Sequence, residues 1–315
     1  MPRVPGPGEG KAIEGVLFGR PGAGSFVDAG AKAFERAREQ LGATVRTHWL
    51  EVQDTASRIA HLRAIAARRP ALIVLHGAQG EALVEAVAGD HPDVMFSVSQ
   101  GHVDARNAAS YEVRLEEAAF LAGALAAWIS ASGVLGHLSG ERVRAGLKGR
   151  AGFAAGATYA RAGVRLVSTF CGSQHDVDLA ARCVVEQAGA GADIVFTMLG
   201  AGRDGAIRAC RELGMRQIGD GVNWCELHPD VFIASALADS AWGTYGAIED
   251  FLAGRFRPGE TMSMGLEQEH LCRLVCSVDV PNEMRARLDQ VAQDIVAGRV
   301  VVPQYWNEPT TDAPR

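Results

Sequence analysis

A glycine-rich loop in the second half of the chain has the residue types and spacing of a dinucleotide-binding turn. Gly200, Gly202 and Gly205 complete a G-x-G-x-x-G directly after the apolar run IVFTML, and a helical pattern begins at Arg203. Asp220 ends the next expected strand, where an acidic residue can bind a ribose hydroxyl. The fingerprint normally opens its domain, whereas here other strand–helix units precede it and no catalytic constellation accompanies it. An NAD(P)-dependent enzyme using this GAGRDG loop is therefore kept as an alternative hypothesis.

A second group of reactive residue types lies near the C-terminus. His270, Cys272 and Cys276 fall at even spacing on one expected strand, so they would share a face as metal ligands or as a redox pair. A zinc site needs a fourth ligand and usually a closer C-x-x-C pair, so core thiols are the favoured interpretation. Ser25 and His175 lack the context of an activated nucleophile. We therefore predict no catalytic residues, no metal and no cofactor.

These residues are carried by a regular alternation of strand and helix patterns, which is typical of an α/β fold with parallel sheets covered on both faces. The expected strands are Ala12–Phe18, Thr44–Leu50, Ala71–His76, Val94–Ser99, Ala109–Val113, Val134–Leu138, Val164–Phe170, Asp193–Leu199, Arg216–Gly219, Val231–Leu237 and an extended piece Thr261–Cys276. The expected helices are Phe26–Leu41, Thr55–Ala67, Glu81–Ala88, Arg114–Ser130, Arg144–Arg161, Asp176–Gln187, Arg203–Leu213, Ser240–Leu252 and Asn282–Ala297. Two such series in 315 residues predict two doubly wound domains.

The helix expected at Arg114–Ser130 has an apolar stripe built largely of small side chains. Its members recur at steps of three and four: Leu115, Ala118, Ala119, Ala122, Leu125, Ala126 and Ile129. Because small residues let another backbone come close, we expect close packing along this stripe.

The segments PDVMFSVSQG, NAASYEVRLEEAAFLAGALAA and GVLGHLSG resemble the signature of the BMP/PnrA-like family, and the resemblance extends from about Ala12 to Pro303. Members of that family are substrate-binding proteins that deliver purine nucleosides or related bases to ABC importers. The resemblance implies two lobes of the periplasmic-binding-protein-like type I fold, an ABC permease as partner, and capture of a ligand without turnover.

We expect one lobe to comprise residues 12–132 with 238–260, and the other to comprise residues 133–237 with 261–303. Residues 1–11 and 304–315 are expected to be loose termini. The connections near Ser132, Leu237 and Met262 would act as a hinge, with the ligand in the cleft and closing it.

Ligands of such sheets bind at loops that follow the carboxyl ends of the strands. Aromatic, amide and glycine residues in these loops suit a flat heteroaromatic ligand. The predicted ligand-binding residues are Phe26, Ser25, Gly77, Gln100, Gly200, Asn223, Trp224 and Trp242.

Three positions depart from the family's polar pattern. Ser25-Phe26-Val27-Asp28 resembles the family's D-x-S-F-N-D turn, but its first aspartate is Ala23 here. The aspartate of the family's I-G-V-D-S-D, a ribose ligand in nucleoside-binding members, falls on Gly221, and a lysine that contacts the ribose falls on Ala238. The resemblance therefore implies a purine-like ligand, and the departures favour a nucleobase over a nucleoside.

Composition limits the partners and the location. The net charge of −6 and pI near 5.9 argue against nucleic acid as a partner. No apolar run approaches the roughly 20 residues of a membrane span, so no integral membrane segment is expected. The six cysteines read as reduced, buried thiols, and the N-terminus MPRVPGPGEGKAIEG has no secretory h-region. A periplasmic or extracytoplasmic location is expected if an export signal was removed; otherwise a cytoplasmic, purine-responsive regulator is the alternative.

Overall fold

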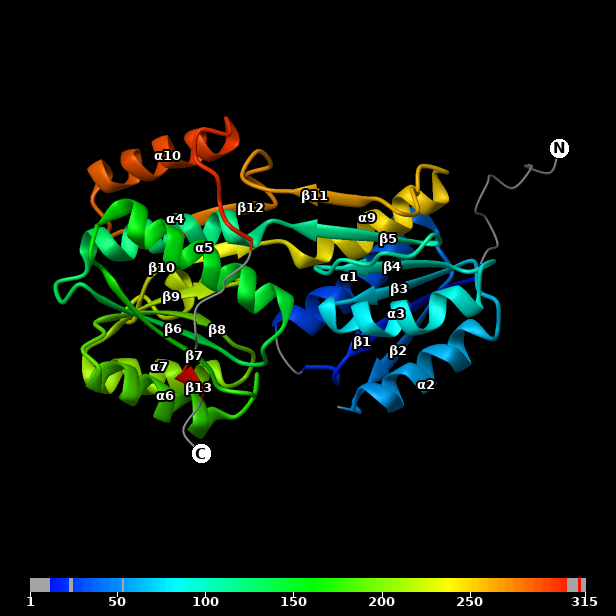
Figure 1. Cartoon of the computed structure of the whole chain (residues 1–315), viewed down its shortest axis with the longest axis horizontal. Coiled ribbons are helices and arrows are strands. Elements are labelled where there is room, and N and C mark those ends of the chain that lie inside the picture. Colours follow the sequence, from blue (N-terminus) through cyan, green and yellow to red (C-terminus); the bar gives the residue numbers. More distant parts are fainter. Residues whose placement is uncertain (1–11, 23–24, 53, 305–310, 313–315) are drawn as a thin grey trace. The chain divides into compact units, whose positions relative to one another are not determined.

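The computed structural model describes residues 12–22, 25–52, 54–304 and 311–312, and it divides into two compact units (Figure 1). Unit 1 comprises the described residues up to Val113 together with Asp239–Ser263. Unit 2 comprises Arg114–Ala238 and the described residues from Met264 onward. Each unit has a mainly parallel sheet with helices on both faces, so the predicted α/β class with two doubly wound lobes is confirmed.

Unit 1 is built on a six-stranded sheet in the order β11-β5-β4-β3-β1-β2. Its strands are β1 (Ile13–Phe18), β2 (Val45–Leu50), β3 (Leu72–His76), β4 (Met95–Ser99), β5 (Ala108–Val113) and β11 (Thr261–Met264). Its helices are α1 (Ser25–Leu41), α2 (Thr55–Ala66), α3 (Glu81–Val87) and α9 (Ser240–Leu252), with short 3-10 turns η1 (Ala78–Gly80) and η2 (Ala88–Asp90). β1 to β5 pair in parallel, so their carboxyl ends lie at one edge.

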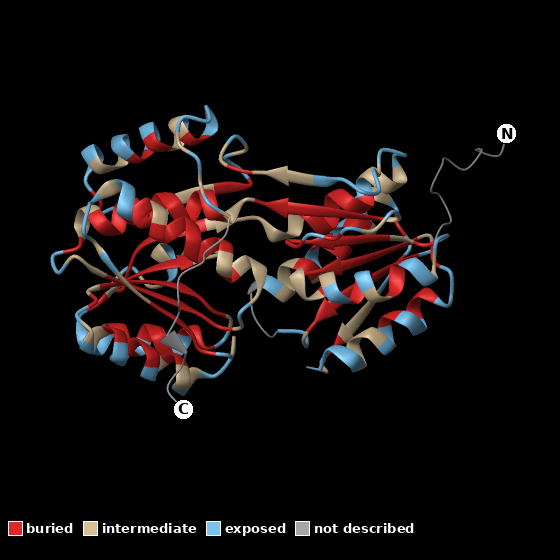
Figure 2. Cartoon of the chain, viewed as in Figure 1, coloured by how far each residue is buried: buried red, intermediate tan, exposed pale blue. Residues whose placement is uncertain are grey.

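Successive side chains of each strand point to opposite faces of this sheet. On β3, Leu72 and Val74 pack with α1 and α9, while Ile73 and Leu75 pack with α2 and α3. All four side chains are fully buried, and β3, like β1 and β5, is coloured as buried in Figure 2. Strands buried on both faces are near-continuous apolar runs, which is why LIVL could be read as a strand.

Unit 2 is built on a seven-stranded sheet in the order β12-β10-β9-β8-β6-β7-β13. Its strands are β6 (Val134–Ser139), β7 (Arg165–Phe170), β8 (Ile194–Met198), β9 (Arg216–Asp220), β10 (Phe232–Ala238), β12 (Cys272–Cys276) and β13 (Thr311–Asp312). Its helices are α4 (Leu115–Ile129), α5 (Arg144–Ala160), α6 (Val177–Gly189), α7 (Arg203–Leu213), α8 (Trp224–Leu227) and α10 (Asn282–Val296). Only β12 is antiparallel among the pairings given by the described residues.

α4 and α5 pack with their backbones in near contact. A Cβ atom at Gly123 of α4 would overlap the carbonyl of Phe153, and one at Gly156 of α5 would overlap the carbonyl of Phe120. Close packing of α4 was expected, but α4 is buried on almost all sides rather than along one stripe. This contact groups α4 with unit 2, so the contacts divide the chain at Val113, whereas the sequence analysis extended the first lobe to residue 132.

The single extended piece expected at Thr261–Cys276 is wrong. β11 and β12 belong to different sheets, and a turn separates them. His270 is exposed in that turn rather than on the strand of Cys272 and Cys276. The three residues therefore do not form the one-strand group that was considered as a metal or redox site.

Most of the two ends that were expected to be loose, residues 1–11, 305–310 and 313–315, lies outside the described residues. The described part of the tail is ordered, because β13 pairs in parallel with β7 through Thr169 and Phe170. Within the described residues, none of the helices has the length and apolar character required to cross a bilayer.

Candidate functional site

The carboxyl edge of the unit 1 sheet brings together four of the predicted ligand-binding residues. Gly77 and Gln100 directly follow β3 and β4. Phe26 lies in the first turn of α1, directly after Ser25, and Trp242 lies in the first turn of α9. Ala23, the residue at the family's aspartate position, lies outside the described residues.

Phe26 is the exposed aromatic residue of this edge, with 37% of its surface accessible. Its ring lies against the imidazole of His76, with ring centroids 4.4 Å apart and planes inclined by 33°. Gly77 has φ of 122°, and a Cβ at this position would come 3.2 Å from the Phe26 ring. The turn after β3 therefore needs glycine, both for its backbone conformation and for the position of this ring.

His76 fixes the backbone of Phe26 from below. Its Nε2 lies 2.9 Å from the Phe26 carbonyl oxygen, which can only accept, so Nε2 carries the proton. Its Nδ1 lies 2.7 Å from the Thr244 hydroxyl of α9 and 3.2 Å from the Ser99 hydroxyl of β4, and it accepts from one of them. Burial lowers the pKa of His76 to about 4, so the ring is neutral at pH 7. This buried network joins β3, β4, α1 and α9.

Gln100 and Trp242 are held by unit 1 itself. In the orientation that satisfies both of its groups, the Gln100 amide donates to the Val113 carbonyl (3.2 Å) and accepts from the Val113 N–H (3.1 Å). The Trp242 ring packs on Tyr111, with centroids 6.1 Å apart. Both residues lie at the expected edge, and both have structural contacts there.

In unit 2, the glycine-rich loop after β8 is packed against the loop after β7. The N–H groups of Gly200 and Gly202 both donate to the Gln174 carbonyl, at 3.0 Å each. A Cβ at Gly205 would overlap the carbonyl of Val177 at the start of α6. The donors that would hold a pyrophosphate in a dinucleotide site are thus directed to a main-chain carbonyl.

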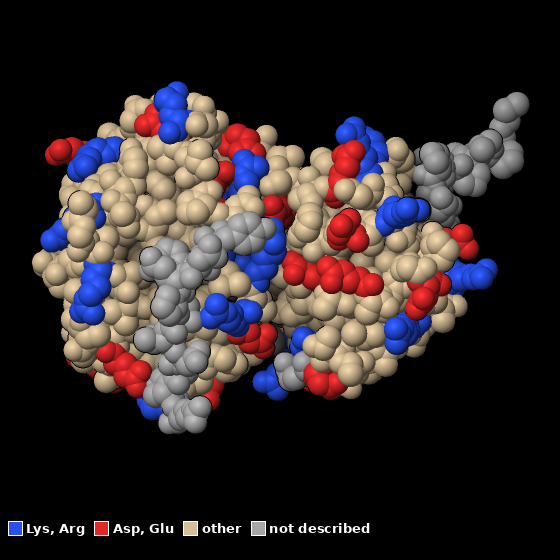
Figure 3. Space-filling model, in the orientation of Figure 1, with Lys and Arg blue, Asp and Glu red and all other residues tan. Residues whose placement is uncertain are grey.

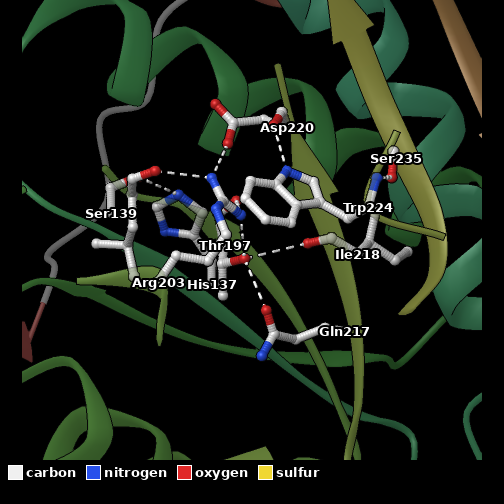
Figure 4. Close-up of polar contacts among 10 residues, drawn as sticks. His137, Ser139, Thr197, Arg203, Gln217, Ile218, Asp220, Trp224 and Ser235 are labelled. Atoms are coloured by element: carbon white, nitrogen blue, oxygen red, sulfur yellow. Dashed lines mark hydrogen bonds and ion pairs between the residues drawn. The ribbon is translucent and has the colours of Figure 1, made fainter. Parts of the chain in front are cut away.

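The charged residue inside this motif is buried beneath the carboxyl edge of the unit 2 sheet (Figure 4). The Arg203 side chain is 2% exposed and is paired with Asp220 at the end of β9. Its guanidinium lies 4.5 Å from the centre of the Trp224 ring, whose Nε1 donates to the Asp220 carbonyl at 2.8 Å. Burial raises the pKa of the Asp220 carboxyl, and the Arg203 charge opposes this shift.

Asn223 and Trp224 lie together after β9, as the sequence analysis expected. The Asn223 amide nitrogen donates to Glu226 at 2.6 Å. Trp224 is half-buried and stacks on Phe232, with centroids 5.7 Å apart. Part of the Trp224 ring therefore belongs to the core of unit 2.

The sequence analysis missed the polar residues that support these loops. His76 ends the apolar strand LIVLH, and Arg203 stands in a glycine motif where a charged side chain would be expected to face solvent. A third, His137 on β6, bonds to the hydroxyls of Ser168 and Ser139 at 2.9 Å each. Burial and the charge of Arg150 lower the pKa of His137 to about 3. The only available signal was a polar residue interrupting a strand or loop expected to be buried.

Charged side chains and possible metal ligands were compared over the part of the chain that the structure describes. On the face shown in Figure 3, basic and acidic side chains are interspersed over both units. Among the described residues, no three His, Cys, Asp or Glu side chains are placed to hold a metal ion together. All six cysteines are free thiols, four of them buried.

Solved structures with this fold include solute-binding proteins and a regulator. A solute-binding protein of an ABC transporter system from Aeropyrum pernix K1 has a TM-score of 0.80 and 24% identity, covering 93% of this chain and 94% of that protein. A transcriptional activator of the comK gene from Bacillus halodurans has a TM-score of 0.73 and 18% identity, covering 91% and 98%. At these identities the likeness establishes the fold, which is that of type I periplasmic binding proteins.

Similar sequences include basic membrane proteins of Borrelia and Borreliella. Basic membrane protein A2 of Borrelia garinii subsp. bavariensis is 24% identical over 287 residues, covering 89% of this chain and 84% of that protein. Basic membrane protein D of Borreliella burgdorferi is 29% identical over 226 residues, covering 69% and 66%. The model of the family described as ABC transporter substrate-binding protein PnrA-like matches residues 22–304. The chain therefore belongs to the PnrA-like family of ABC transporter substrate-binding proteins.

Proposed function

We propose that this protein captures a small purine-like ligand outside the cytoplasm, prefers the nucleobase to the nucleoside, and delivers it to an ABC permease. The ligand contacts would come from the carboxyl-edge loops of each unit. The residues proposed for these contacts are Ser25, Phe26, Gly77, Gln100, Gly200, Asn223, Trp224 and Trp242.

The observation that carries the proposal is the exposed Phe26 ring. Large apolar side chains are normally covered in a folded protein, and this one stands 37% exposed at the edge where parallel sheets bind ligands. His76 backs the ring and holds its main chain, so the ring is preorganised. A fixed aromatic face of this kind suits a flat heteroaromatic ligand.

The preference for a base rests on the two positions where the family's ribose ligands would stand. Gly221 has φ of 80° and carries no side chain, and its N–H donates to the Ala236 carbonyl at 3.1 Å. Ala238 ends β10 with a methyl group. A ribose hydroxyl buried without a partner costs about 1–3 kcal/mol, so a nucleoside should bind more weakly than its base.

Calorimetric titration of adenine, hypoxanthine and their nucleosides tests the proposal. The wild type should bind the bases more tightly than the nucleosides. Phe26→Ala should weaken base binding by about 1–3 kcal/mol, the scale of base–aromatic stacking, with little change in melting temperature. The matched control is Tyr159→Ala, which removes an aromatic ring 50% exposed on α5. Absence of purine binding, or tighter binding of nucleosides, would contradict the proposal.

A cytoplasmic, purine-responsive regulator is the second candidate function. It is favoured by the six free thiols and by the likeness in fold to a transcriptional activator. The two candidates differ in compartment. Fractionation of the native host, followed by immunodetection, should place the protein outside the cytoplasm if it serves an importer and inside if it is a regulator.

A further inference from the structure

Arg203 is the largest fully buried side chain among the described residues, and its guanidinium is held from several sides. One terminal nitrogen donates to the Thr197 carbonyl and hydroxyl at 3.1 and 2.9 Å. The other donates to the Leu199 carbonyl at 2.8 Å and to Asp220. The Trp224 ring lies over the guanidinium plane (Figure 4). Arg203 is therefore a rigid partner for the carboxylate of Asp220.

Asp220 is the accessible member of this pair. Its side chain is 29% exposed, against 2% for Arg203, and it lies at the end of β9 where ligands of such sheets bind. Oδ1 accepts from Arg203, whereas Oδ2 has no hydrogen-bond partner among the described residues and points away from the guanidinium in Figure 4. The pair thus presents one fixed, charged acceptor at the carboxyl edge.

A second acceptor follows in the same loop. The Asn223 amide nitrogen donates to the carboxylate of Glu226, which can only accept, and this contact assigns the other end of the amide as the oxygen. That oxygen is buried and has no partner within the described structure. Two nearby donors are already used, because Trp224 Nε1 bonds to the Asp220 carbonyl and the Gly221 N–H bonds to the Ala236 carbonyl. Asp220 Oδ2 and Asn223 Oδ1 thus remain as acceptors in the loop after β9, and such acceptors call for donors on a ligand.

The charges of Asp220 and Arg203 indicate which kind of donor group a ligand would need here. Arg203 already compensates the Asp220 carboxylate, so a fully charged cation is not required for neutrality. A neutral group with adjacent N–H donors can pair with both oxygens of the Asp220 carboxylate, because Arg203 uses only one of the two lone pairs of Oδ1.

We propose that Asp220, positioned by Arg203, is a specificity-determining residue that selects ligands with adjacent N–H donors, of which the N1–H and 2-amino groups of a guanine-type base are the matching case. This assignment rests on the proposed function as a purine-binding protein. It gives that function a preferred ligand class, the 2-aminopurines with a protonated N1.

The test uses three 6-oxopurines with different groups at C2: guanine with an amino group, hypoxanthine with hydrogen, and xanthine with an oxygen and a proton on the neighbouring N3. Equilibrium dialysis with radiolabelled bases should show guanine bound about 10-fold or more tightly than hypoxanthine, and xanthine most weakly. Asp220→Asn removes the charged acceptor and should reduce the guanine preference to less than about 3-fold. Asp204→Asn makes the same charge change at an exposed position beside Arg203 and should leave the preference intact.

Because Asp220→Asn leaves a buried guanidinium without its counter-ion, its fold is checked by circular dichroism. If it unfolds, the double variant Arg203→Met with Asp220→Asn removes both charges and should show the same loss of preference. Purine binding without discrimination at C2, or discrimination that survives removal of Asp220, overturns this assignment alone. An effect of Asp220→Asn on guanosine but not on guanine would make Asp220 a ribose ligand and would also overturn it. Absence of binding of all three bases to the wild type refutes the proposed function, and this assignment with it.

Discussion

Replacing Gly156 by alanine should destabilise the protein through the contact between α4 and α5. A Cβ at this position would overlap the carbonyl oxygen of Phe120 and would also come within 3 Å of its carbonyl carbon and Cα. All three atoms belong to the α4 backbone, which cannot rotate aside as a side chain can. The two helices would have to separate, and Gly152 and Gly123 make equivalent contacts along the same interface.

The magnitude follows from two opposing effects. Insertion of a methyl group into a closely packed interior typically costs about 1–3 kcal/mol. Alanine in a helix is favoured over glycine by about 1 kcal/mol, which offsets part of that cost. We expect a net loss of about 1–2 kcal/mol, which corresponds to a fall in Tm of about 2–8 °C for a unit of this size.

Differential scanning calorimetry measures this change, and Gly189→Ala is the matched control. Gly189 is also helical, but a Cβ there would meet nothing within 4 Å, so only the propensity gain remains. The control should be neutral or slightly stabilised. Equal Tm values for Gly156→Ala and wild type, or a larger loss for the control, would refute the reasoning from backbone contact.

Two further predictions concern buried charge. Stability should fall as pH drops from about 6.5 towards 4, because His76 and His137 have folded pKa values of about 4 and 3 while the unfolded chain takes up protons near 6.5, a loss approaching 1.4 kcal/mol per pH unit for each histidine. Urea unfolding at several pH values measures this loss, and the free energy of unfolding of His76→Gln should depend less steeply on pH than that of the wild type. An unchanged pH dependence would show that His76 does not take up a proton on unfolding. Glu116→Ala should cost about 3–5 kcal/mol, because it removes a buried carboxylate that lies 2.9 Å from the buried Lys148 ammonium, whereas Asp178→Ala in the exposed pair with Arg208 should cost under about 1 kcal/mol by the same unfolding assay.

The fold was predictable because its signals are local. The strands of a doubly wound sheet are apolar on both faces, and glycine or polar residues end them, so LIVLH and IVFTM could be recognised without a partner. The errors arose where the sequence pattern does not indicate with which strand an extended segment pairs. The piece from Thr261 to Cys276 is extended at both ends, but assignment of its halves to different sheets depends on pairing with β5 and β10.

The loops of the candidate site were predictable in position more than in contacts. The carboxyl ends of parallel strands share an edge, so the clustering of Phe26, Gly77, Gln100 and Trp242 on unit 1 followed from topology. Topology does not say which polar groups are already used. The Gln100 amide bonds to Val113, and His76 bonds to the carbonyl of Phe26. Both contacts join residues far apart in the sequence or on separate elements, so they can be known only from the folded structure.

The G-x-G-x-x-G loop shows why such a motif does not identify its ligand. Its glycines allow a tight turn with accessible backbone N–H groups, and their lack of side chains lets another group approach the backbone closely. In a dinucleotide site that neighbour is a pyrophosphate, whereas here Gly200 and Gly202 donate to the Gln174 carbonyl and Gly205 accommodates Val177. The acidic residue at the end of the next strand is likewise paired with Arg203 from within the motif. A glycine fingerprint is therefore evidence for a phosphate only when its N–H groups have no acceptor in the chain, and in this protein it holds two loops of one unit together.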